Sequence, residues 1–399
     1  MEEFHLENEI KIFIWQPSID HLHYYTWLAL QSLLPSPIKF IVGTSENKIR
    51  KAQNWKPLDL QELSPIYLPR KNLLKGGVQL LNENLDAIHV FCGFRGAAGY
   101  NLFPLIFHAL RKGVKVAVID EAYATSPVGY FHNENIIYSY MKVWVRPWLR
   151  YGMAKVLYAV SHVYKPCILA LSMTAKKQFL EVGFAPETIF PFGYFVPKQK
   201  KVLTNENKSD SLHLIFVGAL IFRKGLDILA DAIRSLCKQG YKVELDIYGA
   251  GNIEKTKFVD LPIYFKNTLP FDQIQGVIAK HDLLILPSRH DGWGVVVNEA
   301  LLQGVPVIAS SKVGAKQILE FSRAGLIFET ENVNDLVEKI KMVIDSPMIL
   351  YEMKRKASQV GQEIMPENAA QYFLNVLKYY FYKIGRLPSA IWSEESYPE

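Results

Sequence analysis

The chain has few cysteines and no long hydrophobic run. Its 399 residues include three widely spaced cysteines, Cys92, Cys167 and Cys237. This number and spacing indicate neither a disulfide framework nor a metal site, as is typical of a protein in a reducing cytoplasm. No run of about 18 uncharged apolar residues occurs, so we expect no membrane-spanning helix. The acidic, polar first residues, MEEFHLENEIK, also lead us to expect no signal peptide.

The overall charge is low. A net charge of +6 leaves room for acidic ligands but does not indicate nucleic-acid binding. A hydrophobic content of 49%, with 21% charged residues, is typical of a globular chain with a large core. A chain of this length is expected to form roughly one to three domains, and two are favoured.

Short β-branched runs alternate with helical patterns along both halves of the chain. Near-continuous apolar strands joined by helices are typical of parallel sheets that are covered on both faces. The pattern therefore predicts an α/β protein with two doubly wound, Rossmann-like domains and a ligand cleft between them. We expect strands at residues 10–15, 38–43, 87–93, 114–120 and 167–172, and again at 212–218, 243–249, 262–267, 282–287, 305–310 and 325–329.

A polar, lysine-rich stretch separates the two halves. The segment PKQKKVLTNENKSDS has almost no apolar residue, which is typical of a linker. We therefore expect a first domain at residues 1–197, a linker at 198–211, a second domain at 212–375, and a final helix and tail at 376–399.

One long segment of the first half contains no acid. Between Asn135 and Leu180 there is no Asp or Glu, but there are seven Lys or Arg, mixed with Trp, Tyr and Val. A basic, aromatic, amphipathic stretch can lie on an anionic membrane surface. Residues 138–166 are therefore expected to contact such a membrane peripherally. The alternative is a helix that packs on its own domain with its basic side chains reaching into water.

Strand ends in the second half combine glycine turns with the start of a helix. Such a turn makes an anion site, because free N–H groups and the helix dipole point at the ligand. In FVGALIFRKGLDIL, Gly218 ends a strand, and Arg223 and Lys224 precede a helix. A forked Arg and a compact Lys suit a diphosphate, although a solvated basic loop is the alternative. In LDIYGAGN, Gly249 and Gly251 follow a strand where a base or ribose could lie against the backbone.

The stretch SRHDGWGVVVNEALLQG, residues 288–304, carries two acids around a third turn. Asp291 lies before the helix that we expect near residue 295, and Glu299 lies about one turn inside it. Either carboxylate could accept hydrogen bonds from neighbouring hydroxyls, as on a ribose or a sugar. The alternative is that Asp291 caps the helix and Glu299 lies in a favourable dipole field.

The backbone of the same stretch is predicted to contact the ligand. Glycines allow close approach, and the first N–H groups of a helix have no partner within the helix. The residues concerned are Gly292, Trp293, Gly294, Val295 and Val296.

Together these stretches resemble the donor-binding domain of retaining glycosyltransferases of family four, which have the GT-B fold. The resemblance covers roughly residues 212–330, and the family's pair of acids, separated by seven residues with Gly-aromatic-Gly between them, is met by Asp291 and Glu299. It implies a nucleoside diphosphate sugar as donor, with a UDP-sugar favoured. Glu299 would bind the ribose and Asp291 the hydroxyls of the transferred sugar, while Lys224 and Arg223 would hold the departing diphosphate.

Two positions depart from the family's pattern. Asp291 stands where the family usually has Glu, and Ala219 stands where members often carry Arg after the strand-ending glycine. The shorter acid could change which sugar fits or weaken turnover. Arg223 could replace the missing cation. The resemblance also implies that residues 376–399 cross back to the first domain.

In the first half, the stretches CILALSMTAKKQFLEVGFAPETIFPFGYFVP and IWQPSIDHLHYYTWLAL resemble parts of the acceptor domain of enzymes that build bacterial polysaccharides. By this resemblance Gln16, in the opening strand and loop, would face the cleft. Asp120 and Glu121 occupy a position where many relatives have His. Either acid could touch the sugar or accept the proton of the acceptor hydroxyl, and Glu121 could instead be structural. His21 and His23 are further candidates, each with a structural alternative.

These observations lead to one principal expectation and two alternatives. We expect a metal-independent, cofactor-free hexosyltransferase that retains anomeric configuration and acts on a glycan or lipid-linked glycan in cell-surface polysaccharide synthesis. We expect it in the cytoplasm, where it could be peripheral on the inner face of the membrane. The alternatives are a nucleotide-sugar epimerase on the same fold, and a non-catalytic subunit that binds a nucleotide sugar or a partner.

Overall fold

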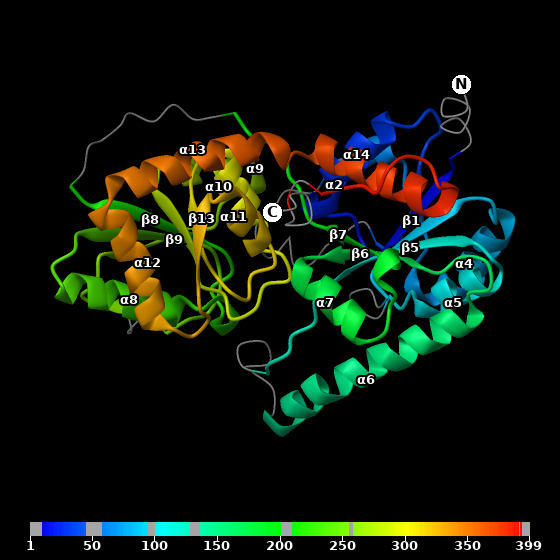
Figure 1. Ribbon diagram of the computed structural model, residues 1–399, viewed down its shortest axis with the longest axis horizontal. Coiled ribbons are helices and arrows are strands. Elements are labelled where there is room, and N and C mark those ends of the chain that lie inside the picture. The colour runs from blue at the N-terminus through cyan, green and yellow to red at the C-terminus, as the bar shows by residue number, and fades with distance from the viewer. Residues whose placement is uncertain are drawn as a thin grey trace.

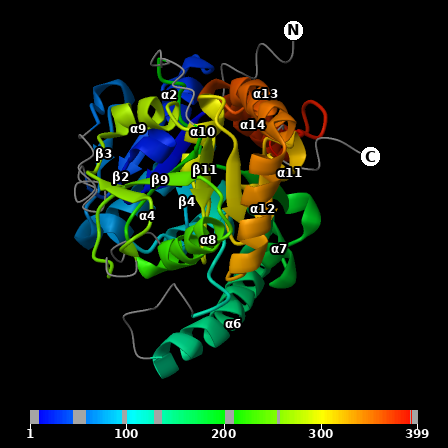
Figure 2. The ribbon, with the colours of Figure 1, turned by 90° about the vertical axis from the view of Figure 1, so that its left-hand side faces the viewer.

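The computed structural model describes residues 10–44, 58–94, 100–127, 136–200, 210–254, 258–390 and 392. Two α/β domains lie side by side, each with a parallel sheet between helices (Figure 1). One long helix extends away from both sheets, as the second view also shows (Figure 2). The predicted pair of Rossmann-like domains is therefore confirmed.

The first domain is built on seven parallel strands in the order β3-β2-β1-β4-β5-β6-β7. Its inner strands are buried on both faces, which explains their continuous apolar sequence. Two strands escaped prediction: β3 has only two residues, both exposed, and β7 contains Pro191, which an edge strand accommodates. The strands are β1 Ile12–Gln16, β2 Lys39–Val42, β3 Ile66–Tyr67, β4 Ile88–Cys92, β5 Lys115–Glu121, β6 Cys167–Leu171 and β7 Ile189–Phe192.

Helices of the first domain alternate with these strands. The longest, α6, spans the basic, aromatic segment and contains Pro147. Along the described residues, no helix combines the length and hydropathy needed to cross a membrane. The helices are α2 His21–Ser32, α4 Leu73–Glu83, α5 Phe103–Arg111, α6 Ile136–Val160 and α7 Met173–Glu181, with 3-10 turns at Gln61–Leu63, Arg70–Asn72 and Pro186–Thr188.

The second domain repeats the arrangement with six parallel strands in the order β10-β9-β8-β11-β12-β13. A strand was expected at each of these six positions. In both sheets the strand order reverses beside the first strand, which opens a crevice at the carboxyl ends. The strands are β8 Leu212–Val217, β9 Val243–Tyr248, β10 Ile263–Lys266, β11 Leu283–Leu286, β12 Val307–Ser310 and β13 Gly325–Phe328.

Amphipathic helices cover the second sheet. In α8 the buried residues Leu229, Ile233 and Leu236 recur at helical spacing and face the core. Asn332 caps α12 by accepting a hydrogen bond from the Asp335 amide. The helices are α8 Leu226–Lys238, α9 Phe271–Ile278, α10 Val296–Leu302, α11 Lys316–Ser322, α12 Val333–Asp345 and α13 Pro347–Glu363, with a 3-10 turn, η5, at Phe222–Lys224.

The chain returns to the first domain at its C-terminal end. Helix α14, Pro366–Leu377, packs on α2, with the rings of Phe373 and Trp27 in edge contact at 5.5 Å between centroids. A π-helical turn follows at Lys378–Tyr382. Trp392 is buried with its ring centroid 4.3 Å from that of Phe195. Because α14 already contacts α2, the crossing begins at Pro366 rather than at the expected position 376.

Candidate active site

A cavity of about 760 Å³ lies between the two domains, where the carboxyl ends of both sheets face each other. The first domain contributes Asp20, Leu22, His23, Glu121, Ala122 and Tyr194 to its wall. The second domain contributes the three predicted turns that follow β8, β9 and β11. Ligands of open α/β sheets bind at this edge, so the cavity is the candidate active site.

Two cations lie at the carboxyl end of the second sheet and contact the loop that follows β11. Lys224 Nζ lies 2.5 Å from the Asp291 carboxylate, and both side chains are mostly buried. The Arg223 guanidinium donates a hydrogen bond to the His290 carbonyl at 2.6 Å. Both cations line the cavity, as the sequence predicted, and they lie in the turn η5 that precedes α8. The Lys224–Asp291 contact itself had no signal in the sequence.

This ion pair controls the charge of Asp291. Burial alone raises the pKa of the carboxyl, but Lys224 and then Arg223 outweigh burial and leave it below its ordinary value. Asp291 is therefore a carboxylate at neutral pH. Arg223 also affects the neighbouring His290: burial and then the charge of Arg223 lower the pKa of His290 to about 4, so this imidazole is neutral.

The turns after β8 and β9 are held together by their backbones. The Gly218 amide donates to the Tyr248 carbonyl at 3.0 Å, and the Leu220 amide donates to Ala250 at 2.8 Å. Gly249 has φ 154°, and a Cβ there would collide with the Gly218 carbonyl. Glycine is thus required at this position for the packing of one turn on the other.

The predicted ligand contacts of these turns are only partly retained. Gly218 and Gly249 line the cavity. Gly251 lies outside its wall, because its backbone packs against Leu220. Its glycine is explained by that close approach and not by a ligand.

The Gly-Trp-Gly turn after β11 packs against the first domain. The Trp293 indole donates to Asn298 at 2.9 Å, and its ring meets Phe195 of the first domain with centroids 5.8 Å apart. A Cβ at Gly193 would strike the same ring. Trp293 touches the cavity wall, but its side chain is chiefly a wedge between the domains.

The glycines and the second acid of this turn face the cavity. A Cβ on Gly292 would collide with the Glu121 carboxylate, so the glycine lets the two domains approach at this point. Gly294, with φ 90°, directs the chain into α10. Val295, Val296 and Glu299 also line the cavity, and Glu299 is only 2% exposed.

Arg289 holds the turn η5 and the loop after β11 together, and the sequence did not predict this contact. Its guanidinium makes a forked pair with Asp227, with both distances 2.7 Å, and it also bonds Glu331 at 2.5 Å. The Arg289 guanidinium also lies over the Phe222 ring, and the Arg289 backbone amide donates to the Arg223 carbonyl at 2.8 Å. Arg289 therefore fixes η5 against the β11 loop. A basic residue next to a histidine and an acid gave no sign of this function.

On the first-domain wall, Glu121 occupies the position opposite Asp291. The Tyr194 hydroxyl donates to its carboxylate at 2.6 Å. Protein surrounds the group on most sides, although the side chain remains accessible from the cavity. Burial raises the pKa of Glu121, the hydrogen bond from Tyr194 opposes that rise, and the charges of Asp120 and Asp291 add to it.

The other predicted residues of the first domain take different positions. Asp120 pairs with Arg150 of α6 at 3.3 Å and does not line the cavity. Gln16 is also absent from the wall, because it is buried and accepts a hydrogen bond from the Trp27 indole at 3.3 Å. His21 packs on Phe271.

Of the two predicted histidines, His23 lines the cavity. Its ring contacts those of Trp27 and Tyr194. It reaches the cavity from α2, directly beside the Tyr194 that bonds Glu121.

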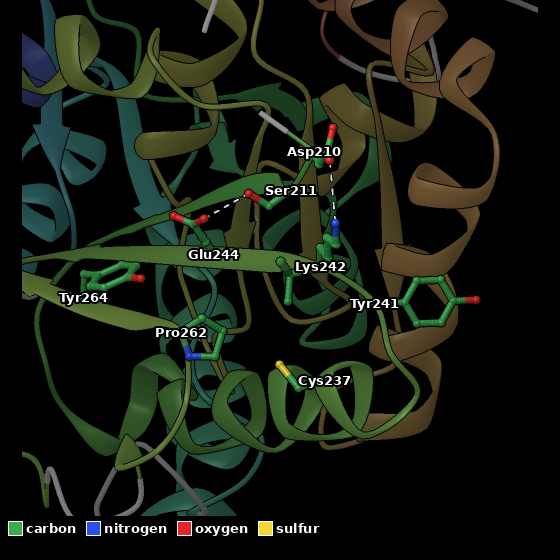
Figure 3. Close-up of a pocket in the computed structure, with 9 residues that line it drawn as sticks. Asp210, Ser211, Cys237, Tyr241, Lys242, Glu244, Pro262 and Tyr264 are labelled. Carbon is green, nitrogen blue, oxygen red and sulfur yellow. Dashed lines mark hydrogen bonds and ion pairs between the residues drawn. The ribbon is translucent and has the colours of Figure 1, made fainter. Parts of the chain in front are cut away.

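A smaller pocket of about 340 Å³ lies on the outer side of the second domain, far from these groups (Figure 3). Four of its polar side chains form two pairs: Ser211 bonds Glu244 at 2.9 Å, and Lys242 lies 3.6 Å from Asp210. Within the described ranges, no three His, Cys, Asp or Glu side chains cluster as metal ligands would.

Comparison with known proteins agrees with this geometry. Two facing Rossmann-like domains with a cleft at their carboxyl ends define the GT-B class of glycosyltransferases. A family model described as "Glycosyl transferases group 1" matches residues 211–346. Residues 211–346 are therefore similar to the group 1 glycosyl transferases, and the resemblance to a GT-B glycosyltransferase family is confirmed.

Individual relatives show where the similarity lies. An uncharacterized glycosyltransferase of Methanocaldococcus jannaschii is 32% identical over 173 residues, which is 41% of this chain and 45% of that protein. A poly(ribitol-phosphate) alpha-N-acetylglucosaminyltransferase of Staphylococcus aureus is 23% identical over 171 residues, or 40% of this chain and 34% of that protein. The match thus spans less than half the length of these relatives.

A solved structure shares the whole fold. Anabaena HepE in complex with UDP-glucose superposes with a TM-score of 0.61 at 14% identity, covering 92% of this chain and 99% of that one. At this identity the likeness concerns the fold alone.

Proposed function

We propose that the protein transfers a hexose-type sugar from a nucleoside diphosphate sugar, with a UDP-sugar favoured, to a hydroxyl of a glycan or lipid-linked glycan. The transfer retains the anomeric configuration. One observation carries the proposal: two cations and two acids of the second domain share a cavity with Glu121 of the first domain. Cations bind phosphate oxygens strongly and carboxylates accept hydrogen bonds from sugar hydroxyls, and a nucleotide sugar presents both groups.

The departing diphosphate is the group that the second domain stabilises. Arg223 and Lys224 lie side by side in η5, and both line the cavity. A guanidinium has more N–H groups than its bond to the His290 carbonyl uses. Preorganised cations at the site of developing charge provide the kind of electrostatic stabilisation that often dominates catalysis. This arrangement supplies the charge stabilisation from side chains, so we propose a metal-independent transfer.

In the proposed reaction the bond from the anomeric carbon to the diphosphate oxygen breaks, and the electron pair leaves with the diphosphate. The acceptor hydroxyl attacks the anomeric carbon from the same face. Its proton passes to the departing diphosphate oxygen or to the Glu121 carboxylate. The Glu121 site fits a proton acceptor, because Tyr194 holds the carboxylate in place while burial raises its pKa.

The two acids of the second domain have different tasks in this proposal. Asp291, held by Lys224, lies opposite Glu121 and would bind hydroxyls of the transferred sugar. Glu299, inside α10, would bind the ribose. Similar proteins support the substrate classes: HepE was solved with UDP-glucose, and the staphylococcal relative is a poly(ribitol-phosphate) alpha-N-acetylglucosaminyltransferase. We therefore place the protein in the synthesis of cell-surface polysaccharide.

Thermal-shift measurements with UDP, GDP and their sugars test donor binding. A specific donor at about one hundred times its dissociation constant stabilises the folded state by about 2.7 kcal/mol. Glu299→Gln should weaken the shift given by a nucleotide sugar, while Glu320→Gln, on the surface of α11, should leave it unchanged. Identical shifts in both variants contradict the assignment of Glu299.

Turnover measurements separate transfer from the alternatives. Donor consumption that depends on an added glycan acceptor, and that persists in EDTA, supports metal-independent transfer. Conversion of the donor sugar without acceptor indicates an epimerase. Specific binding without turnover, across a panel of acceptors, indicates a binding subunit.

A further inference from the structure

We propose that helix α6 docks on an anionic lipid bilayer through its outward aromatic face, defined here as Ile137, Met141, Trp144, Trp148 and Tyr151. Figures 1 and 2 show α6 extending away from both sheets along one edge of the molecule. Trp144 is 71% exposed and Trp148 is 64% exposed. Two neighbouring tryptophans so open to water are unusual on a monomer surface and mark an interaction site.

The exposed residues form one stripe on the helix. The members of the outward face recur every three or four residues, which places them on one side. The opposite side holds the helix to its domain, where Ala154 and Leu157 are buried. The helix therefore has one side that packs on its own domain and a second, aromatic side whose members are 43% to 71% exposed.

Charge identifies the partner as an anionic surface. The sequence from residue 136 to residue 179 contains no acid. Lys142 lies over the Tyr138 ring at 4.4 Å, and Lys155 lies over the Tyr151 ring at 5.2 Å, so cations flank the outward aromatics. Trp and Tyr settle at the headgroup level of a bilayer, and each nearby Lys gains from anionic lipid.

Geometry favours a helix that lies on the surface. A helix of 25 residues is about 37 Å long, and its charged and aromatic residues alternate along the whole length. Such a helix lies in the interface plane with its apolar rings at the boundary of headgroups and acyl chains. A flat protein partner would instead require acids opposite Lys142 and Lys155, while a bilayer of anionic lipid meets both groups at once.

Docking would place the acceptor wall of the cleft near the bilayer. Arg150, on the inner side of α6, bonds Asp120 at 3.3 Å and also the Glu121 carbonyl at 3.4 Å. Its guanidinium also lies over the rings of Tyr123 and Phe179. The helix is thus fixed to the strand that ends in Glu121. An acceptor carried on a lipid would approach this side of the cavity, a consequence that rests on the proposed function.

Vesicle flotation with the full chain tests the docking. The protein should float with vesicles of phosphatidylglycerol and phosphatidylcholine, stay behind with phosphatidylcholine alone, and be released by high salt. Trp144→Ser with Trp148→Ser should reduce partitioning by about tenfold or more, because both rings leave the interface. Lys142→Glu with Lys155→Glu should remove the preference for anionic lipid.

A matched control uses exposed apolar residues elsewhere. Met348→Ser with Tyr351→Ser, on α13, changes two similarly exposed side chains and should leave partitioning unchanged. The proposal is overturned if the wild type ignores anionic vesicles at low salt, or if both double variants bind as the wild type does. It is also overturned if light scattering shows a dimer that the tryptophan variant dissociates, since a second copy would then cover the face.

The test is independent of catalysis. The thermal shift that a nucleotide sugar causes should be the same in the tryptophan variant and the wild type, because α6 carries no donor contact from its outward face. Loss of vesicle binding with an intact donor shift supports the docking surface alone. Vesicle binding by a protein that shows no donor shift leaves the docking intact and contradicts the proposed function.

Discussion

The two sheets share one strand order, yet their facing ends are built differently. In the second domain, backbone turns and paired charges form the cavity wall: Gly218 bonds Tyr248, and Lys224 bonds Asp291. In the first domain, separate side chains form the cavity wall, and Glu121 is held in place by a hydrogen bond from Tyr194. The second wall therefore has its backbone turns and charges fixed in place by contacts with each other, while the first is a surface of separate polar groups.

Under the proposed function, this difference corresponds to two chemical tasks. A diphosphate has fixed charge and fixed shape, so turns, glycines and cations at set positions can recognise it. An acceptor glycan offers neutral hydroxyls that few residues need to contact. The second wall should accordingly lose function through charge changes, and the first through changes in protonation. Three predictions test this contrast, from the largest effect to the smallest.

Lys224→Ala should produce the largest effect. Removing a donor that stabilises the leaving group costs about 10²–10³ in turnover in comparable sites. The variant also leaves Asp291 buried without its main partner. Since Lys224 lowers the pKa of Asp291, the pair stabilises the wild type above the unfolded pKa of the acid, about 4, and this contribution disappears as the pH falls through the lower folded pKa. Turnover assays and thermal unfolding across pH measure both effects.

Lys242→Ala is the matched control. Lys242 also faces an aspartate, but this pair lies on the surface at 3.6 Å, with the Asp210 side chain almost fully exposed. Exposed pairs contribute little to stability, and this pair is outside the cavity. Full activity of Lys224→Ala, or an equal loss in Lys242→Ala, contradicts the assigned function of the cavity pair.

Arg289→Ala should destabilise the second wall with a smaller direct effect on chemistry. The Arg289 side chain is 5% exposed and bonds both Asp227 and Glu331. Breaking a fully buried pair costs about 3–5 kcal/mol. Both acids here reach water, so we expect about 2–3 kcal/mol in urea unfolding, with weaker donor binding because η5 loses its support. Arg234→Ala, which removes an exposed pair with Asp231, should cost under about 0.5 kcal/mol.

The same contrast explains what could be predicted from the sequence. The strands of the second domain and its three turns have strong local signals: apolar runs, glycines and adjacent charges. The strands β3 and β7 had no such signal in the sequence. β3 has only two residues, both exposed, and β7 contains a proline, so neither shows the apolar run of a buried strand. Arg289 and Tyr194 were missed for another reason, since their partners Asp227 and Glu121 lie more than 60 positions away in the chain.

Resemblance alone misplaced some residues of the first wall. Gln16 was expected at the cleft, but the Trp27 indole holds it inside the domain. Asp120 and Glu121 were equal candidates, because adjacent strand residues point to opposite faces and sequence does not say which face is which. In the structure Arg150 pairs with Asp120, and the Glu121 carboxylate lines the cavity.

Glu121→Gln should produce the smallest and most specific effect. The amide keeps a partner for the Tyr194 hydroxyl but removes the proton acceptor. Because the departing diphosphate can also take the proton, we expect a loss of about tenfold, below the usual range for acid–base groups. Burial raises the pKa of this carboxyl, with added contributions from Asp120 and Asp291, so wild-type turnover should fall as the pH drops through that raised pKa. The variant should lose this limb of the pH profile.

Glu121→Gln should lower turnover but slightly raise the stability of the fold at neutral pH. A carboxyl whose folded pKa is raised stabilises the protein fully below its unfolded pKa, and that contribution is lost as the pH rises through the folded pKa. Glu121→Gln should therefore match the wild type in acid and unfold at a slightly higher temperature at neutral pH. The gain is small because the side chain is open to the cavity. Asp86→Asn, on an exposed pair with Lys11, changes an acid far from the cleft and should leave the pH profile of turnover unaltered. A Glu121→Gln profile that keeps the acid limb would assign proton transfer to another group and make the first wall a binding surface only.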